Sequence, residues 1–226
     1  YKDKAYFVIW TTTTWTLPGN VAIALNGRFD YSLVKVENGE MYILATELID
    51  AVQKATGFGS YEIVKNFKGS DLEYMVCRHP FIDRDSLVIN GDHVTLDAGT
   101  GCVHTAPGHG AEDYVACLNY DVPMVVPVDS KGVLNEHAGK FSGMFYKKSN
   151  DAIIEELKSV NALLAIEPIT HSYPFCWRCG NPIIFRAAEQ WFASVEGFKK
   201  ETLEAIKTVK WIPEWGQDRI SSMVSE

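Results

Sequence analysis

The sequence predicts an α+β fold in which a strand-rich core carries inserted helices. Two features predict it. Runs of β-branched and aromatic residues are separated by strong turn signals, and amphipathic helical patterns lie between and after those runs. The 226 residues are enough for one compact domain with a smaller appendage and a substantial buried core.

Strands are expected mainly in the first half of the chain. Residues 6–16 are almost entirely β-branched or aromatic, which predicts a strand that opens the fold. Two hairpins follow, because Asn-Gly pairs tolerate the positive φ angles of tight turns. They are expected at 31–44 around Asn38-Gly39 and at 87–96 around Asn90-Gly91.

Two helices are expected within this strand-rich part. The first has Thr46 as its cap and stops at Gly57, since its apolar residues recur at helical spacing between these points. The second runs from Ala111 onward and places Glu112 and Asp113 in its first turn. Carboxylates are favoured there by the helix dipole.

Two more helices are expected in the second half, at 151–160 with Ser149 or Asn150 as cap, and at about 198–208. The segment from Pro168 to Pro174 interrupts the helical pattern between them. We therefore expect a division there, with one domain over 1–168 and a separate segment over 169–226.

Composition and charge limit the classes of function. A hydrophobic fraction of 46% with 22% charged residues is ordinary for a globular protein, and no apolar run is long enough to span a bilayer, so we expect no membrane contact. The formal charge of -8 argues against tight autonomous binding to a polyanion. Any contact with a nucleic acid must therefore be local or be helped by other domains.

The five cysteines are an odd number in a chain too large to need disulfides, which predicts a reducing, cytoplasmic environment. Cys176 and Cys179 are spaced like half of a zinc site, with His171 near enough to be a third ligand. We expect either that the partner pair lies outside this chain or that no metal binds. The start at Tyr1, without an initiator methionine or a signal-peptide pattern, indicates a fragment of a longer protein.

The threonine run Thr11 to Thr14, followed by Trp15, is the first candidate for chemistry. Threonine is a good strand former, so a purely structural role is a strong alternative. Four hydroxyls in succession are nevertheless unusual, and hydroxyls that both donate and accept hydrogen bonds suit the binding of a water or a ribose hydroxyl.

The glycine-rich loop over 99–110 and the residues after it are the second candidate. Three interpretations remain open for His104, His109 and Asp113. In the first, they are polar loop residues, and Asp113 complements the dipole at a helix N-terminus. In the second, Asp113 pairs with a substrate ammonium group through a charge-assisted contact. In the third interpretation they form a metal site together with Cys102, although the spacing matches no helix-borne metal motif.

Several segments resemble the editing (CP1) domain of bacterial-type isoleucyl-tRNA synthetases, which are class I aminoacyl-tRNA synthetases. The resemblance spans nearly the whole chain. The chain lacks the arginine that the valyl and leucyl enzymes carry in the threonine segment, so the resemblance is to the isoleucyl enzymes. It also lacks the synthetase's ATP-binding signatures. The matching segments are Trp10-Thr11-Thr12-Thr13-Thr14-Trp15-Thr16-Leu17-Pro18-Gly19-Asn20, the glycine-rich loop with Glu112-Asp113-Tyr114, His171 to Cys179, and Trp211 to Arg219.

The resemblance implies a β-barrel-like editing domain over 1–168 and a stem over 169–226 that returns to the synthetase core. It implies an aminoacyl-tRNA deacylase that removes valine from mischarged Val-tRNA(Ile), as part of an isoleucine–tRNA ligase, without a cofactor for editing. The implied partners are the acceptor end of tRNA(Ile) charged with valine and the rest of the synthetase chain. We expect a monomer.

The resemblance also implies a role for each matched residue. Asp113 would bind the α-ammonium of the misattached amino acid, and His104 would contact the terminal adenosine and help to hold the ester. Thr11, Thr12 and Thr13 would shape the side-chain pocket and position the attacking water. The pocket's support and further substrate contacts would come from Trp15, Gly108 and His109.

One residue departs from the family pattern, since Thr14 stands where the family usually has proline. Two alternatives to editing also remain. A metal-dependent hydrolase could use the loop of His104, His109 and Asp113. A non-catalytic RNA-binding barrel could follow a nucleic-acid backbone with a cluster of three lysines, Lys140, Lys147 and Lys148.

Overall fold

The computed structural model describes residues 5–225, and Tyr1 to Lys4 lie outside the described residues. The chain divides into two compact units, Tyr1–Ala187 and Ala188–Glu226. Residues 169–187, which the resemblance assigns to the return stem, therefore belong to the first unit. The functional division into an editing domain and a stem stays a prediction.

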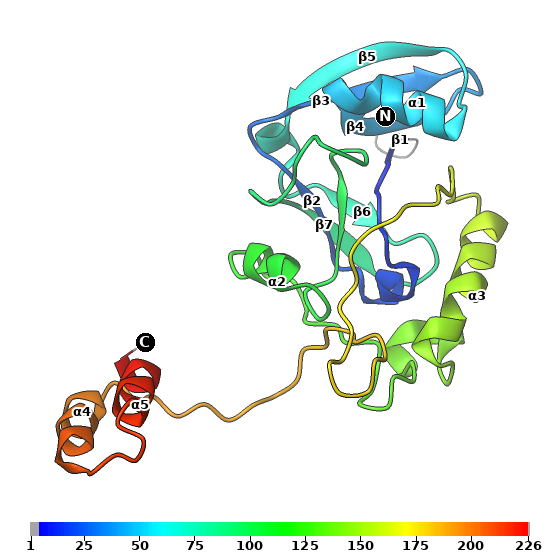
Figure 1. The fold of residues 1–226 in the computed structure, drawn as a ribbon. Coiled ribbons are helices and arrows are strands. Elements are labelled where there is room, and N and C mark those ends of the chain that lie inside the picture. Colours follow the sequence, from blue (N-terminus) through cyan, green and yellow to red (C-terminus); the bar gives the residue numbers. More distant parts are fainter. Residues whose placement is uncertain (1–4, 226) are drawn as a thin grey trace. The chain divides into compact units, whose positions relative to one another are not determined.

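The first sheet of the larger unit has the order β1-β4-β3-β5 (Figure 1). Its members are β1 (Ala5–Phe7), β3 (Asp30–Val36), β4 (Met41–Ala45) and β5 (Tyr61–Lys68). The expected hairpin around Asn38-Gly39 is confirmed, because β3 and β4 pair antiparallel and Gly39 has φ 88°.

The second sheet has the order β6-β7-β2-β8. Its members are β2 (Ala22–Leu25), β6 (Val76–Arg78), β7 (Asp85–Asn90) and β8 (Val103–Thr105). The expected hairpin around Asn90-Gly91 is wrong. Here β7 pairs in parallel with β2. The residues after Gly91 form no strand, and Val94 among them is buried against the sheet.

The two sheets share one core, because the largest buried cluster joins Ile23, Leu25 and Val88 of the second sheet to the strands of the first. This confirms a mixed fold with strands and inserted helices. Within residues 5–225 the strands form two separate four-stranded sheets and no closed barrel, so the barrel-like description is not confirmed.

The strand expected over 6–16 is mostly wrong. β1 ends at Phe7, Trp10 forms an isolated bridge to Val103, and a 3-10 helix, η1, follows over Thr14–Gly19. Hydroxyls cause the difference, since the Thr13 amide donates to Thr11 Oγ1 at 3.1 Å and Thr16 Oγ1 donates to the Thr13 carbonyl at 2.7 Å. Local bonds of this kind compete with strand pairing.

Most of the expected helices are present in the larger unit. After a short 3-10 helix η2 (Thr46–Leu48), α1 (Ile49–Thr56) ends at Gly57 in the left-handed conformation as expected, and it packs on the first sheet. The Thr46 hydroxyl bonds to Ser32 instead of capping this helix. The helix expected from Ala111 is confirmed as α2 (Ala111–Cys117), with Glu112 and Asp113 in its first turn.

A third helix, α3 (Tyr146–Ser159), begins earlier than expected, after Phe145 and not at Ser149 or Asn150. Ile153 and Leu157 of α3 share a buried cluster with Trp15 and Leu17 of η1. In the additional first turn, the Tyr146 ring packs against Trp15 at a centroid distance of 5.1 Å. Two further 3-10 helices complete the larger unit, η3 (Gly69–Leu72) and η4 (Glu136–Phe141).

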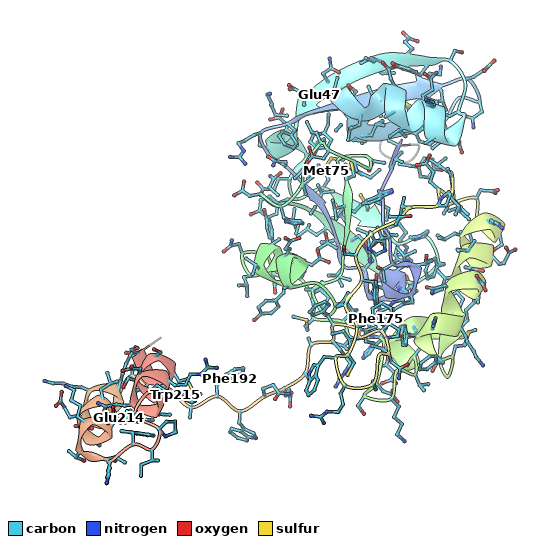
Figure 2. The ribbon with its side chains drawn as sticks, in the orientation of Figure 1. Glu47, Met75, Phe175, Phe192, Glu214 and Trp215 are labelled. Carbon is cyan, nitrogen blue, oxygen red and sulfur yellow. The ribbon has the colours of Figure 1, made fainter. Side chains whose placement is uncertain are left out.

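The smaller unit contains two helices, α4 (Lys199–Thr208) and α5 (Gly216–Ser225). The first confirms the expected helix. The Trp211 indole donates to the Ile206 carbonyl at 2.9 Å and closes the turn after α4. Large aromatic side chains on this segment are exposed, including Phe192 and Trp215 (Figure 2). No described helix of either unit has the length and apolar character needed to cross a membrane.

Candidate active site

The threonine run and the histidine loop meet at one cavity of about 400 Å³. We call it the threonine cavity. Thr11, Thr12 and Thr13 line one side of it. Four further candidate residues, Trp15, His104, His109 and Asp113, also line this cavity. The structure thus brings together seven of the eight residues expected to form the site.

Gly108 is the candidate that does not line the cavity. Its carbonyl accepts a hydrogen bond from the Ala187 amide at 2.8 Å, and a Cβ at this position would lie 2.5 Å from the Val125 carbonyl oxygen. Gly108 therefore allows two backbones to approach closely behind the cavity. A direct contact between Gly108 and a substrate stays a prediction.

The threonine segment is held firmly at its C-terminal end. Arg84 donates from Nη1 to the Pro18 carbonyl at 2.7 Å, and the buried His79 donates from Nε2 to the Leu17 carbonyl at 3.0 Å. Burial lowers the pKa of His79 to about 4, so this imidazole is neutral near pH 7. The backbone of η1 is thus fixed by side chains from the loop between β6 and β7.

His104, on β8, is fully engaged within the protein. The Asn20 amide donates to its Nδ1 at 2.8 Å, so the proton resides on Nε2, which donates to Thr16 Oγ1 at 3.0 Å. Thr16 Oγ1 in turn donates to the Thr13 carbonyl. Burial lowers the pKa of His104 to about 3, and the imidazole is therefore neutral.

This chain of bonds gives His104 an indirect role in the structure. The side chain is only 6% exposed and both ring nitrogens are occupied, so His104 supports the threonine segment through Thr16. It has no free nitrogen with which to act as a general base. The direct contact with a terminal adenosine that the resemblance implies stays a prediction.

Asp113 has one carboxylate oxygen left for a ligand. Its Oδ2 accepts a hydrogen bond from the Ala106 amide at 2.8 Å, and within residues 5–225 no other hydrogen bond or ion pair engages the carboxylate. Burial raises the pKa of Asp113, and the hydrogen bond from Ala106 acts against that rise. A cationic ligand in the cavity would stabilise the charged form.

His109 contributes a buried acceptor. Its Nδ1 lies 2.9 Å from the Phe185 carbonyl, which requires the proton on Nδ1 and leaves Nε2 unprotonated. Nε2 is buried and has no partner among the described residues. The ring packs edge-on against Trp15 at a centroid distance of 4.8 Å. Since Trp15 is 5% exposed, it fixes His109 from within the core.

The metal interpretation finds little support in the geometry. Across the described part of the chain, no three His, Cys, Asp or Glu side chains are placed to hold a metal ion. In the histidine loop, His104 has no free nitrogen, and burial raises the pKa of the Cys102 thiol, which disfavours the thiolate that a metal requires.

Cys176 and Cys179 lie on a tight turn in which the Gly180 amide donates to the Cys176 carbonyl at 2.8 Å. The pKa of Cys176 is lowered by a hydrogen bond from the Cys179 amide, which favours the thiolate that zinc binds. The pair therefore fits half of a tetrahedral site, and zinc binding with ligands from outside this chain stays a prediction.

Two parts of the site were not predicted from the sequence. Thr16 and Asn20 hold His104, although both lie within the quoted threonine signature. Residues 171–174 and 183–185 close the cavity from a segment expected to be only a stem. No periodicity or turn signal could have predicted that closure, because it depends on tertiary contacts such as those of Phe185 with His109.

Comparisons with known sequences match the whole chain. The family described as tRNA synthetases class I (I, L, M and V) matches residues 1–226. Isoleucine–tRNA ligase of Caldicellulosiruptor saccharolyticus is 61% identical over 223 residues, covering 99% of this chain and 24% of that protein. The corresponding ligase of Caldicellulosiruptor bescii is 59% identical over 221 residues, covering 98% of this chain and 24% of that protein. The chain spans about a quarter of the length of these curated relatives.

Solved structures share the fold at low sequence identity. A structure described as GlLeuRS-CP1 has a TM-score of 0.57 and 17% identity, covering 73% of this chain and 85% of that one. The editing domain of the P. falciparum cytosolic leucyl-tRNA synthetase has a TM-score of 0.56 and 10% identity, with coverages of 72% and 80%. The structural similarities concern the fold, whereas the family match over residues 1–226 shows that the chain belongs to the class I tRNA synthetases of the I, L, M and V group.

Proposed function

We propose that the threonine cavity hydrolyses valine from mischarged Val-tRNA(Ile), as the editing site of an isoleucine–tRNA ligase. The observation that carries the proposal is the convergence of the threonine run and Asp113 on one cavity. Identity to isoleucine–tRNA ligases and a fold shared with leucyl editing domains support it.

A second site of this kind is needed because the synthetic site alone discriminates poorly between isoleucine and valine. One methylene group in an apolar pocket provides only about 10- to 200-fold discrimination, and the isoleucyl enzyme itself is the known example, at about 150-fold over valine. A cavity that admits valine and excludes isoleucine by size supplies the remaining discrimination. The buried Trp15 and the fixed backbone of η1 give the threonine cavity the rigid wall that such a sieve requires.

In this proposal Asp113 binds the ammonium group of the misattached valine with its free Oδ1. The hydroxyls of Thr11, Thr12 and Thr13 position the ester and the attacking water. His109 Nε2 accepts a hydrogen bond from the ligand or the water. Burial lowers the pKa of His109 and makes it a weak base, so catalysis proceeds mainly by positioning and by polarisation of the carbonyl group.

The remaining partners belong to the same proposal. The substrate is the charged acceptor end of tRNA(Ile), and the other domains of the synthetase supply most of the affinity for tRNA, because this chain has a net charge of -8. We propose a monomeric, cytoplasmic enzyme whose editing reaction needs no cofactor.

The variant Asp113→Asn tests the assignment. An asparagine can still accept the hydrogen bond from the Ala106 amide through its side-chain oxygen, so folding is preserved while the charge is removed. We expect the rate of valyl-tRNA hydrolysis to fall by about 10- to 100-fold, because a charge-assisted contact is lost. Single-turnover hydrolysis with excess protein measures this rate.

Glu112→Gln is the matched control, since Glu112 occupies the same helical turn and is exposed. It should hydrolyse valyl-tRNA at the wild-type rate. An unchanged rate for Asp113→Asn, or an equal loss for both variants, would remove Asp113 from the proposed ammonium site.

A further inference from the structure

His93 is a half-buried histidine that the proposed hydrolysis does not use. It lies after β7, in the segment where the Asn90-Gly91 pair forms no hairpin. Its Nε2 is buried and has no hydrogen-bond partner among the described residues. The neighbouring Asp92 pairs instead with Arg28 at 3.0 Å, on the exposed side of the loop. Unpaired buried polar atoms are uncommon in folded proteins, so this imidazole is a candidate for a functional role.

The segment that carries His93 packs against the inner face of α2. Cys117 on this face belongs to the same buried cluster as Val94, and Ala116 packs against that cluster. A Cβ at Gly91 would lie 2.7 Å from His93 Nδ1 and 3.6 Å from the Ala116 Cβ. The imidazole and Ala116 are therefore close neighbours, and His93 lies beside α2.

Asp113 lies on the same face of α2, one turn before Ala116, because residues three positions apart are neighbours on a helix. Burial raises the pKa of Asp113, whereas the hydrogen bond from Ala106 and the charge of His93 both lower it. Asp113 lines the threonine cavity and His93 does not. His93 therefore acts on the carboxylate from outside the cavity, without reaching a bound ligand.

The other titratable groups around Asp113 do not favour its charged form. On α2 itself, Glu112 raises the pKa of Asp113. Burial and the nearby Asp113 raise the pKa of the Cys117 thiol to about 11, so this thiol is neutral. On the cavity side, burial lowers the pKa of His109, which disfavours an imidazolium there. His93 thus supplies the positive charge that opposes Glu112 at this carboxylate.

We propose that His93 is a positioning residue, which holds the half-buried Asp113 carboxylate in the ionised form that binds the substrate ammonium group. A positive charge beside a carboxylate favours its charged form. Because His93 lies outside the cavity, it is farther from the ammonium group than the carboxylate is, and Coulomb repulsion falls with distance. The inference rests on the proposed function for the role of Asp113.

A pH titration of the Asp113 carboxyl carbon by NMR tests the inference without any substrate. The signal is identified by its absence in Asp113→Asn. We expect the pKa of Asp113 to be higher in His93→Gln than in the wild type, because the charge that lowers it is removed. His93→Asn should act in the same direction. His137→Gln, which replaces an exposed histidine on η4, should leave the titration unchanged.

Hydrolysis separates a positioning role from a merely structural one. At about pH 5, His93→Gln should hydrolyse valyl-tRNA about threefold or more slowly than the wild type, since less of Asp113 is ionised. The difference should shrink at about pH 8, where Asp113 is ionised in both. Added to Asp113→Asn, the same substitution should have no further effect on the rate, because no carboxylate remains to be held.

Two results would overturn the inference. One is an unchanged pKa of Asp113 in both His93 variants, or an equal change in His137→Gln. The other is an equal loss of rate on replacing His93 with and without the Asp113 carboxylate, which would show a structural defect only. If the pKa of Asp113 rises in His93→Gln but the wild type hydrolyses no valyl-tRNA, the proposed function fails and the pairing of His93 with Asp113 stands.

Discussion

Asp113 and His104, both expected in the site, differ in what they can offer a ligand. Asp113 keeps one carboxylate oxygen without a partner, whereas both nitrogens of His104 are bonded within the protein. A motif in the sequence predicts that both residues are needed. The hydrogen bonds show which one can touch a ligand directly and which one supports the wall through Thr16.

The sequence predicted the residues of the cavity better than their connections. Types such as Asp, His and Thr indicate chemistry wherever they cluster, so the threonine run and the histidine loop were evident. The bond from Asn20 to His104 joins residues 84 positions apart, and only the pairing of β2 with β8 brings them together. No local pattern encodes such a pairing.

The paired variants Thr16→Val and Thr16→Ser test the support of the wall. Valine keeps the volume but leaves the buried His104 Nε2–H without an acceptor, which should lower the free energy of unfolding by about 1–3 kcal/mol. Serine keeps the hydroxyl, so the free energy of unfolding of Thr16→Ser should be close to that of the wild type. Urea denaturation measures the difference.

The variants Thr16→Val and Thr16→Ser should also differ in their rates of valyl-tRNA hydrolysis. If His104 supports the threonine segment through Thr16, hydrolysis of valyl-tRNA falls in Thr16→Val and is largely retained in Thr16→Ser. Equal stability and equal rates in the two variants would show that the hydroxyl of Thr16 is not part of the support.

At the scale of elements, helices and strands were predicted with unequal success. The end of helix α1 could be predicted from Gly57, because glycine readily adopts the left-handed conformation that ends the helix. The high β-propensity of threonine predicts a strand for the threonine run. In the structure its hydroxyls bond to the local backbone and favour a turn into η1, so side-chain chemistry overrode propensity.

The substitution Thr14→Pro tests how η1 begins. Thr14 is its first residue, the position where proline is best tolerated, and Thr13 before it has a non-helical φ of -132°. We expect the variant to be more stable by about 0.4–1 kcal/mol, through loss of freedom in the unfolded chain. Thermal unfolding measures this, and a lower melting temperature would show that η1 starts with a geometry proline cannot adopt.

At the scale of the whole molecule, the α+β class followed from composition and turn signals, whereas the arrangement of the sheets did not. Parallel pairing of β2 with β7 joins distant segments, and the Asn90-Gly91 pair wrongly suggested a local hairpin. Residues 169–187 were expected to be only a stem, yet they close the threonine cavity. The larger unit therefore contains all residues of the proposed site.

The most direct test of the central claim compares two esters of the same tRNA. The wild-type chain would be mixed with valyl-tRNA and isoleucyl-tRNA, both on tRNA(Ile), with and without a strong chelator. We predict that valine is released at least about tenfold faster than isoleucine, since the cavity excludes the larger side chain, and that chelation changes neither rate. Equal release of both amino acids, or loss of hydrolysis on chelation, would contradict the account.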